Sequence, residues 1–359
     1  MPNPFTPPLR AALLASALGA PLALATALPA RALTINTTYA ASVLGSPYAA
    51  QIQAGFQAAA STYQSLFVNP VTVNIQVGWG ELLGSPVTTL GVAGMYGYGS
   101  YGYSQMQTML RATATSTFDQ TAYSRLPATN PAGALNYTLT PALAKALGAA
   151  PATSSGFDGY IGFGKNYIFD FNRADGISAG AHDFTGVALH EISHVLGRVS
   201  GLTASPVNAL PIDAFRYTAP GAPSFKYAAS TYFSIDGGTT NLANFANGSG
   251  QERDSWVHTP GDAFSYAGTA GIVNDLTTAD RILMDVLGWN TVPGTTTPVY
   301  GTTTPTSGGG KTRPGKRNLE DGQDLVGIPE PASLALLGAA LLGLGIASGH
   351  RRPTLAAPA

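Results

Sequence analysis

A long stretch with almost no apolar side chains limits where this chain can fold. Residues 290–326 read "NTVPGTTTPVYGTTTPTSGGGKTRPGKRNLEDGQDLV", which is rich in Thr, Pro and Gly. Such a segment cannot bury enough apolar surface to offset its loss of conformational entropy, so we expect a disordered linker over residues 294–328. An apolar run lies near each end of the chain, at residues 11–28 and 332–349. The folded domain is therefore expected between them, over residues 33–293.

The N-terminal apolar run has the flanks of a secretory signal. Arg10 precedes it, and small residues follow at Ala30 and Ala32. This order is typical of a signal peptide, which we place at residues 1–32 and expect signal peptidase to remove. The alternative is a membrane anchor that stays in place. The chain contains no cysteine, which excludes disulfides and thiolate metal ligands.

The C-terminal apolar run has different flanks. Pro329, Glu330 and Pro331 precede it, and a basic cluster at residues 350–352 follows. At about 1.5 Å per residue, a helix over residues 332–349 would span about 27 Å, close to a bilayer core, with the basic cluster on the cytoplasmic side. The order of these parts resembles a PEP-CTERM sorting signal, here at residues 329–352. The resemblance implies a Gram-negative envelope with exopolysaccharide and an exosortase that cuts near the tripeptide; a plain C-terminal membrane anchor is the alternative.

The charge of the chain argues against nucleic acid as a partner. Charged residues make up 10 % of the sequence, and the formal net charge is -1. Proteins bind phosphate backbones through clustered Lys and Arg side chains, and the chain as a whole has no such basic field. We therefore expect no nucleic-acid partner.

Hydrophobic spacing predicts one α+β domain with a small mixed sheet. Apolar residues recur at helical spacing in residues 46–67 and alternate in residues 71–81, so a helix should lead into a strand. Short strands are expected at residues 159–164 and 166–171, and a hairpin is expected to turn at Asp236 and Gly237. A final structural helix should begin after Thr277, which is placed to cap it with Asp280 three residues later.

The sequence "HEISH" at residues 190–194 carries the main chemical signal. His190 and His194 are four residues apart, so they share one face of the amphipathic helix expected over residues 183–197. Two imidazoles can hold a divalent metal that lowers the pKa of its water, and Glu191 is placed to accept a proton as that water attacks a carbonyl. The pattern predicts Zn²⁺ at the histidines and peptide hydrolysis with Glu191 as general base. A helix with two surface histidines and an unrelated Glu is the alternative.

With Gly197, the segment "HEISHVLG" resembles the zincin metalloproteases. It is similar to the start of the metzincin motif, whose third histidine would fall at Ser200, so the chain departs from that motif at a ligand. With its C-terminal signal, the chain resembles secreted metalloproteases that carry PEP-CTERM tails; the likeness covers "VTVNIQVGWGEL", the HEISH helix, "DAFRY", "YFSIDGGTTNLANF" and "LMDVLGW". The resemblance implies a zincin-like domain with an active-site helix that acts on a peptide or protein substrate.

The third metal ligand is expected to be Asp213, in "NALPIDAFRYTAPG". The chain can leave the helix at Gly197 and form a loop that returns beneath the metal. Gluzincins and aspzincins, which this spacing resembles, also take an acid from a later segment. Ser200 is a poor rival because a neutral hydroxyl stays protonated, and nothing fixes His258 near the helix. Tyr217 is expected to stabilise the oxyanion of the tetrahedral intermediate. The alternative for Asp213 is a cap or turn acid.

Other residues have simpler explanations beside a functional one. Three residues of one loop could supply oxygens to Ca²⁺, although their spacing differs from an EF-hand and a solvated turn would explain them: Asp170, Asn172 and Asp175. His182 and His258 are isolated, and we expect them to be at the surface or hydrogen-bonded. The tyrosine-rich residues 94–106 could bind polysaccharide through aromatic faces or form a flap over the cleft.

Two functions remain open from the sequence. The first is a secreted zinc endopeptidase, exported by its signal peptide and held at the cell envelope until C-terminal processing releases it. The second is a non-catalytic matrix or adhesion protein of the exopolysaccharide layer, on a zincin fold that lost a ligand. Ser200 favours the second function. Glu191 favours the first, because a helix without chemistry has no need of an acid beside its metal face.

Overall fold

The computed structural model describes residues 33–292. The expected signal peptide (1–32), linker (294–328) and sorting signal (329–352) lie outside the described residues. The described residues belong to one structural unit. Its helices are α1 (Ala41–Leu44), α2 (Ala49–Leu66), α3 (Tyr103–Ala112), α4 (Thr117–Ser124), α5 (Pro141–Ala146), α6 (Phe184–Leu196), the 3₁₀-helix η1 (Pro211–Phe215) and α7 (Thr278–Val286). Its strands are β1 (Thr34–Tyr39), β2 (Thr72–Trp79), β3 (Glu81–Leu82), β4 (Ser85–Pro86), β5 (Gly91–Gly94), β6 (Tyr98–Tyr101), β7 (Tyr137–Leu139), β8 (Gly159–Phe163), β9 (Phe169–Asp170), β10 (His182–Asp183), β11 (Arg216–Ala219), β12 (Ala222–Pro223), β13 (Tyr232–Phe233) and β14 (Ala243–Asn244).

A four-stranded sheet in the order β1, β2, β8, β5 organises the first half of the described chain. β1, β2 and β8 are parallel, whereas β5 pairs antiparallel with β8. Alternate residues of β2 are buried, among them Val73, Ile75 and Val77, as expected for a strand with one face on a core. The predictions of a strand at residues 71–81 and of a mixed sheet are confirmed.

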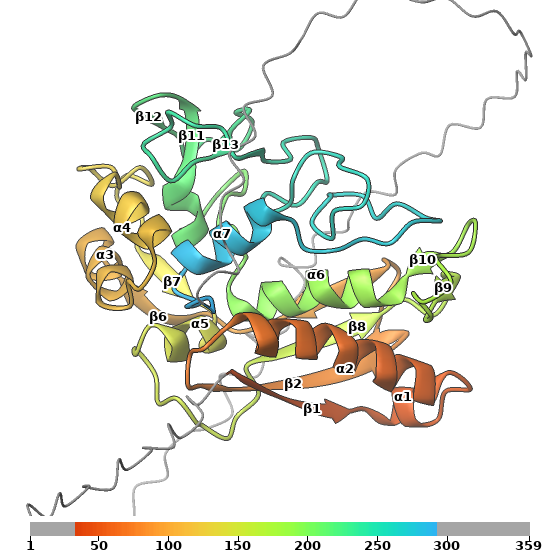
Figure 1. Cartoon of the computed structure of the whole chain (residues 1–359). Coiled ribbons are helices and arrows are strands. Elements are labelled where there is room, and N and C mark those ends of the chain that lie inside the picture. Colours follow the sequence, from red (N-terminus) through yellow and green to blue (C-terminus); the bar gives the residue numbers. More distant parts are fainter. Residues whose placement is uncertain (1–32, 293–359) are drawn as a thin grey trace, which may run out of the picture. The chain divides into compact units, whose positions relative to one another are not determined.

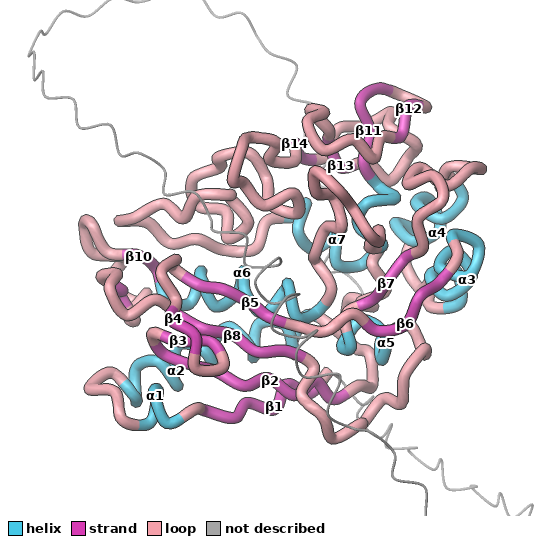
Figure 2. Tube along the Cα trace, turned by 180° about the vertical axis from the view of Figure 1, so that it is seen from behind, coloured by secondary structure: helices cyan, strands magenta, loops and turns pink. Residues whose placement is uncertain are grey.

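Helices α2 and α6 lie side by side on the inner face of this sheet (Figure 1). Seen from behind, the strands lie in front of both helices (Figure 2). The residues whose spacing predicted the first helix are all buried: Ile52, Phe56, Ala59, Tyr63 and Phe67. The Tyr63 hydroxyl donates to the backbone oxygen of Leu189 at 2.7 Å. Helix α6 is therefore fixed to the sheet layer through α2.

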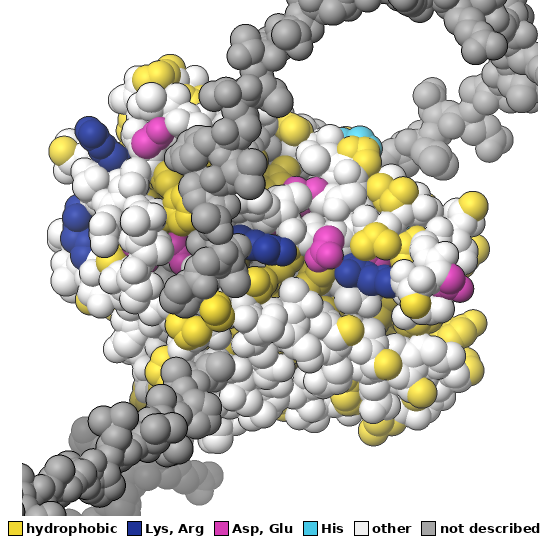
Figure 3. All heavy atoms as spheres, viewed as in Figure 1, with side chains coloured by type: hydrophobic (Ala, Val, Ile, Leu, Met, Phe, Trp, Pro, Cys, Tyr) yellow, Lys and Arg dark blue, Asp and Glu magenta, His cyan; other side chains and the backbone are white. Residues whose placement is uncertain are grey.

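The chain after α6 is rich in loops. β13 and β14 pair antiparallel across the predicted turn at Asp236 and Gly237, which confirms the hairpin. Between residues 245 and 275 the described pairing consists of isolated β-bridges. Helix α7 begins as predicted, because Thr277 Oγ1 accepts from the backbone N–H of Asp280, and Asp280 Oδ2 accepts from that of Thr277. On the face shown in Figure 3, Lys and Arg side chains form separate spots rather than a continuous patch.

A buried ion pair connects α5 to the sheet. Lys145 Nζ lies 2.7 Å from Asp158 Oδ2, and both side chains are almost fully buried. Lys145 also donates to the backbone oxygen of Thr72 at the start of β2. The same Asp158 oxygen accepts from the backbone N–H of Asn74. Each charge is thus compensated by its partner and by hydrogen bonds, which a buried charge requires.

We expect Lys145→Met to lower the free energy of unfolding by about 3–5 kcal/mol, because it leaves the Asp158 carboxylate buried without a cation. Chemical denaturation would measure the loss. Lys165→Met, at an exposed position, should change the stability by no more than about 0.5 kcal/mol. The double variant Lys145→Met/Asp158→Asn should recover part of the loss. A single variant as stable as the wild-type protein would contradict the role given to this pair.

Candidate metal centre

Helix α6 places the two histidines of the HEISH sequence on one face. It ends at Gly197, whose φ of 112° lies in the left-handed region that favours glycine at this position. Asp183 is the N-cap residue, but its side chain makes no capping hydrogen bond. Its carboxylate instead accepts from the Arg173 guanidinium and from the backbone N–H of Asn274. The start of α6 is thereby attached to two loops.

Glu252 joins the two histidines from a later loop. Its Oε2 lies 2.9 Å from His190 Nε2 and 3.4 Å from His194 Nε2, and the two Nε2 atoms are 2.9 Å apart. Within residues 33–292, this is the group of three potential ligands whose donor atoms all lie within 4.8 Å of one another. Glu252 is 62 residues from His190 in the sequence. The three residues could hold one metal ion.

The far nitrogen of each ring fixes the tautomer of both histidines. His190 Nδ1 lies 2.8 Å from the backbone oxygen of Ala263, and His194 Nδ1 lies 2.7 Å from that of Arg198. A carbonyl oxygen can only accept, so each Nδ1 carries the proton and each Nε2 presents a lone pair in the neutral ring. Two lone pairs and a carboxylate oxygen then converge with no donor among them. A cation, either a proton or a metal ion, must lie between them.

The pKa shifts of His190, His194 and Glu252 also favour a cation between these three side chains. Burial lowers the pKa of each histidine, but the nearby carboxylates, Glu252 foremost, together outweigh burial, so the pKa of both His190 and His194 is raised. Burial likewise raises the pKa of Glu252, and the two histidines more than reverse this, so its pKa is lowered. A bound metal ion would take the place of the proton that the histidines otherwise attract.

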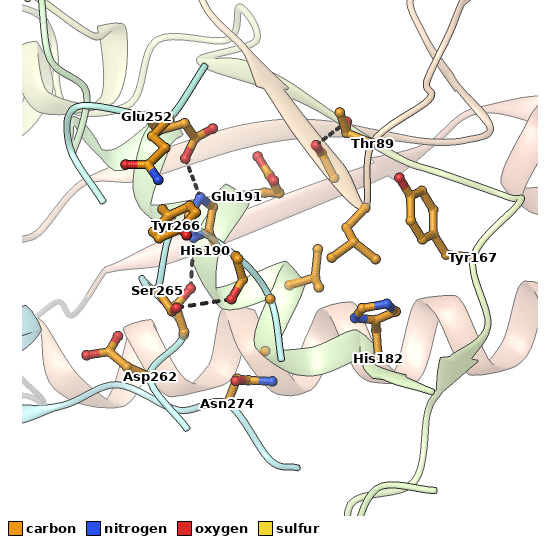
Figure 4. A pocket seen from close by; sticks show the side chains of 18 of the residues that line it. Thr89, Tyr167, His182, His190, Glu191, Glu252, Asp262, Ser265, Tyr266 and Asn274 are labelled. Atoms are coloured by element: carbon orange, nitrogen blue, oxygen red, sulfur yellow. Dashed lines mark hydrogen bonds and ion pairs between the residues drawn. The ribbon is translucent and has the colours of Figure 1, made fainter. Parts of the chain in front are cut away.

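Glu191 lies beside this group without joining it. Its side chain is buried, its Oε2 has no hydrogen-bond partner among the described residues, and burial raises the pKa of its carboxyl to about 7. It packs against β5 so closely that a Cβ at Gly91 would lie 2.5 Å from Glu191 Oε1. His190, Glu191 and Glu252 line a cleft of about 760 Å³ (Figure 4). A buried carboxylate that faces a cleft without a partner is a candidate for chemistry.

A buried guanidinium supports His190 and the loop that carries Glu252. Arg198 follows α6, and its Nη1 lies 2.7 Å from Asp280 Oδ1 with both side chains almost fully buried. Its guanidinium lies over the rings of Trp256 and Phe264, and its Nε donates to the backbone oxygen of Asp254. Phe264 in turn stacks on the His190 ring. The loop that carries Glu252 is therefore held against the end of α6.

Asp213 does not join the histidines. Its two carboxylate oxygens accept from four donors: Ser200 Oγ, Arg216 Nε and the backbone N–H groups of Gly201 and Leu210. Asp213 lies in η1 and accepts a hydrogen bond from the backbone N–H of Leu210, the residue before that helix. This is the cap or turn role that the sequence left open as the alternative. Its oxygen lone pairs already accept hydrogen bonds within the fold. The third candidate ligand is therefore Glu252 rather than Asp213.

The structure also places Tyr217 away from the cleft. Tyr217 begins the pairing of β11 with β12, and its hydroxyl points to the backbone oxygen of Arg125 at 3.5 Å. It is not among the residues that line the cleft, so the structure gives no geometry for the predicted oxyanion role. Tyr266, by contrast, lines the cleft and lies near His190 in Figure 4.

The structure also shows where the remaining candidate site residues from the sequence lie. Asp170 accepts from Asn172 and Ser178 of its own loop, and this loop is not part of the metal-ligand group found among the described residues. The predicted Ca²⁺ site therefore has the geometry of a hydrogen-bonded turn. His258 is exposed and lies 3.2 Å from Ser265 Oγ. His182 lines the cleft, which its isolated position in the sequence did not indicate.

Comparison with known proteins identifies the C-terminal segment. Residues 327–352 match the PEP-CTERM protein-sorting motif. This motif indicates export, sorting at the cell envelope and processing by an exosortase. No curated protein and no solved structure gives a significant match to the chain. Within residues 33–292, no helix is long and apolar enough to cross a membrane; the expected C-terminal helix lies outside that range.

We expect Glu252→Ala to weaken zinc binding at least about tenfold, because the histidines lose the anionic member of their group. Competition with a chelating dye on the zinc-loaded full chain would measure the affinity, and the wild-type chain should hold about one ion. Asp213→Asn is the matched control. It should keep wild-type zinc affinity while lowering the free energy of unfolding by about 2 kcal/mol through its lost hydrogen bonds. The reverse pattern would restore Asp213 as the ligand.

Proposed function

We propose that this chain is a zinc-dependent peptidase with a zincin-like fold, sorted at the cell envelope by its C-terminal motif. One observation carries the proposal. Two imidazole nitrogens and a carboxylate oxygen converge without a donor among them, beside the buried carboxylate of Glu191, on the wall of a cleft. This is the arrangement that metal-assisted hydrolysis needs, with three ligands and a separate acid.

The residues present fit a zinc ion. His190 and His194 would bind through Nε2, since their Nδ1 atoms are committed to backbone carbonyls, and Glu252 would bind through its carboxylate. Nitrogen and carboxylate ligands in this number are typical of catalytic zinc sites. When bound, zinc would polarise a substrate carbonyl and lower the pKa of a water molecule.

Glu191 is suited to act as the general base. Its Oε2 accepts no hydrogen bond from any described residue, so the carboxylate is not committed to another partner, and Glu191 lines the cleft in which a water would attack. Its position is restricted because the backbone of Gly91 leaves no space on that side of the carboxylate. Helix α6 carries Glu191 next to His190, so the base and the two histidine ligands move as one body.

The edge of β5 favours a peptide as the substrate. β5 pairs with β8 on one side, and the described residues provide no strand on its other side. The backbone oxygen of Leu90 accepts from Gly164 N, so the alternating pattern of an antiparallel pair turns the polar groups of Gly91 and Ala93 toward the free edge. The Gly91 oxygen already accepts from Thr89 Oγ1 at 2.7 Å, which leaves the Gly91 N–H and the backbone groups of Ala93 for a partner strand. Because Leu90 and Gly91 line the cleft, an extended peptide could add a strand there beside Glu191.

The non-catalytic alternative rested on Ser200, at the place of the third histidine of the metzincin motif. Glu252 supplies a third potential ligand from another segment, so Ser200 no longer argues for a lost metal site. The peptidase is therefore the proposal that we carry forward.

We expect Glu191→Gln to keep the metal but to lower the rate of peptide hydrolysis at least about a hundredfold, because an amide cannot accept the proton of water. The assay would follow cleavage of unfolded casein by the zinc-loaded full chain, with metal content measured on the same sample. Glu81→Gln is a matched control, since Glu81 bonds to Ser42 Oγ and lies outside the lining of the cleft. Casein cleavage by Glu191→Gln at the wild-type rate would remove Glu191 from the mechanism.

A further inference from the structure

Charged side chains are nearly absent from the first part of the folded domain. Residues 33–110 contain a single charged residue, Glu81, whose carboxylate accepts from Ser42 Oγ and from the backbone N–H of Gly84. In an ordinary soluble domain about a quarter of the residues are charged. On the face shown in Figure 3, the lower part of the molecule, over α1 and α2, carries no side chains in the colours of charged residues. Amide, hydroxyl and apolar side chains form this part of the surface instead.

The outer face of the four-stranded sheet belongs to this uncharged part. In Figure 2 the strands lie in front of α2 and α6, so one face of the sheet is turned away from both helices. Because side chains alternate along a strand, the buried Val77 places Gln76 on the outer face. One row of residues crosses all four strands in register and consists of Thr38, Gln76, Tyr160 and Gly94. Neighbouring strands are about 4.8 Å apart, so the row extends over about 14 Å.

An aromatic cluster borders this row at β8. The rings of Phe157 and Tyr160 have centroids 5.5 Å apart. Burial, and next the neighbouring Tyr96, raise the pKa of the Tyr160 hydroxyl. Phe157 is 39 % exposed and Tyr96 is 45 % exposed, so neither ring is used up in the core. Tyr96 comes from the tyrosine-rich residues 94–106, and its ring is available to a ligand.

Polar groups beside these rings lack a partner inside the described part of the protein. Within residues 33–292, neither the Gln76 side chain nor the Tyr160 hydroxyl makes a hydrogen bond. Further along the face, Asn36 Nδ2 donates to Asn74 Oδ1 at 3.1 Å, and the Asn74 amide donates to two loop carbonyls at 3.0 Å. These bonds hold both amides in place. An amide both donates and accepts, so the face offers both kinds of group to a ligand.

The composition of this face limits the chemistry of its partner. Phosphate backbones, lipid headgroups and acidic polymers would lose hydration there without gaining an ion pair. A stable contact with a second copy of the chain requires an apolar centre, whereas the centre here is a row of amides and hydroxyls. A sugar ring presents C–H groups on its faces and hydroxyls around its rim. The C–H groups pack on aromatic rings, and the hydroxyls pair with amides.

We propose that the outer face of the sheet, from Tyr96 and Phe157 across Tyr160 and Gln76 to Asn36, binds a neutral polysaccharide. The rings stack on the sugar units, and the amides bind their hydroxyls. This face is on the side of the sheet away from α6, so a polymer bound there leaves the cleft open. The inference is independent of the proposed peptidase function and adds to it a second binding surface.

Native affinity electrophoresis tests this surface. The zinc-loaded full chain would be run through gels that contain increasing amounts of dissolved hydroxyethylcellulose, galactomannan, dextran or alginate, and the retardation gives the Kd for each polymer. At least one of the three neutral polymers should slow the chain, whereas alginate, a polyanion, should not. Retardation by alginate alone, or by none of the four polymers, would overturn the proposal.

Single substitutions tie the binding to the named residues. Tyr160→Ala should weaken binding of the retarding polymer about tenfold through the lost ring contact, and Gln76→Ala about threefold through the lost hydrogen bonds. Tyr227→Ala and Gln51→Ala are the matched controls, because both side chains are exposed but lie in the loop before β13 and on α2. Wild-type zinc content would show that each variant keeps its fold. Equal affinities for Tyr160→Ala and Tyr227→Ala would overturn the proposal.

Two further measurements separate this face from the cleft and from self-association. Glu191→Gln, or saturation with the zinc ligand acetohydroxamate, should leave polymer binding unchanged; a loss in either case would place the polymer in the cleft and overturn the proposal. Sedimentation velocity would detect a dimer. A dimer that Tyr160→Ala dissociates, without retardation by any neutral polymer, would assign the face to a second copy instead. A chain that binds the polymer but cleaves no casein would contradict only the peptidase.

Discussion

The buried ion pair between Arg198 and Asp280 is the interaction on which the candidate site depends. A guanidinium taken fully out of water is tolerated only with a partner and hydrogen bonds. Asp280 provides the partner, and it also accepts from the Trp256 indole and from the Thr277 cap. Through its own backbone oxygen Arg198 orients His194, and through Phe264 it supports His190. One side chain thus links α6, α7 and the loop between them.

This arrangement explains how a segment with little regular structure can hold a precise geometry. The described residues from 245 to 275 contain isolated bridges rather than a sheet, so backbone pairing alone does not fix their positions. A tilted ring contact between Phe245 and Trp256, with centroids 4.9 Å apart, adds apolar burial beside the guanidinium. Ser255 Oγ then donates to Glu252 Oε2 at 3.0 Å. Side-chain contacts, rather than strands, carry the loop and its carboxylate to the histidines.

Elements that depend on local periodicity could be predicted from the sequence. Positions that depend on contacts between residues far apart in the chain could not. Helix α2, strand β2, the hairpin at Asp236 and the capped start of α7 follow from spacing and turn chemistry, so they could be predicted. His190, Glu191 and His194 lie in one helix, and their common location could be predicted for the same reason. Glu252 lies in a loop whose sequence, "QERDSWVH", carries no ligand spacing, and its approach depends on buried contacts of Arg198. Asp213 follows a loop that could return to the helix, and its spacing resembles that of gluzincins and aspzincins, so the sequence favours Asp213 over Glu252.

Ser200 connects the two halves of the candidate site. Ser200, where the metzincin motif has its third histidine, donates its hydroxyl proton to Asp213 and its backbone N–H to Asp254 Oδ2. Asp254 is two residues beyond Glu252, so the segment after α6 holds the very loop that carries the third potential ligand. A histidine at position 200 would have to give up the contact with Asp213, which also binds Arg216. The residues after Gly197 therefore anchor the Glu252 loop instead of contributing a side chain to the candidate metal-binding group themselves.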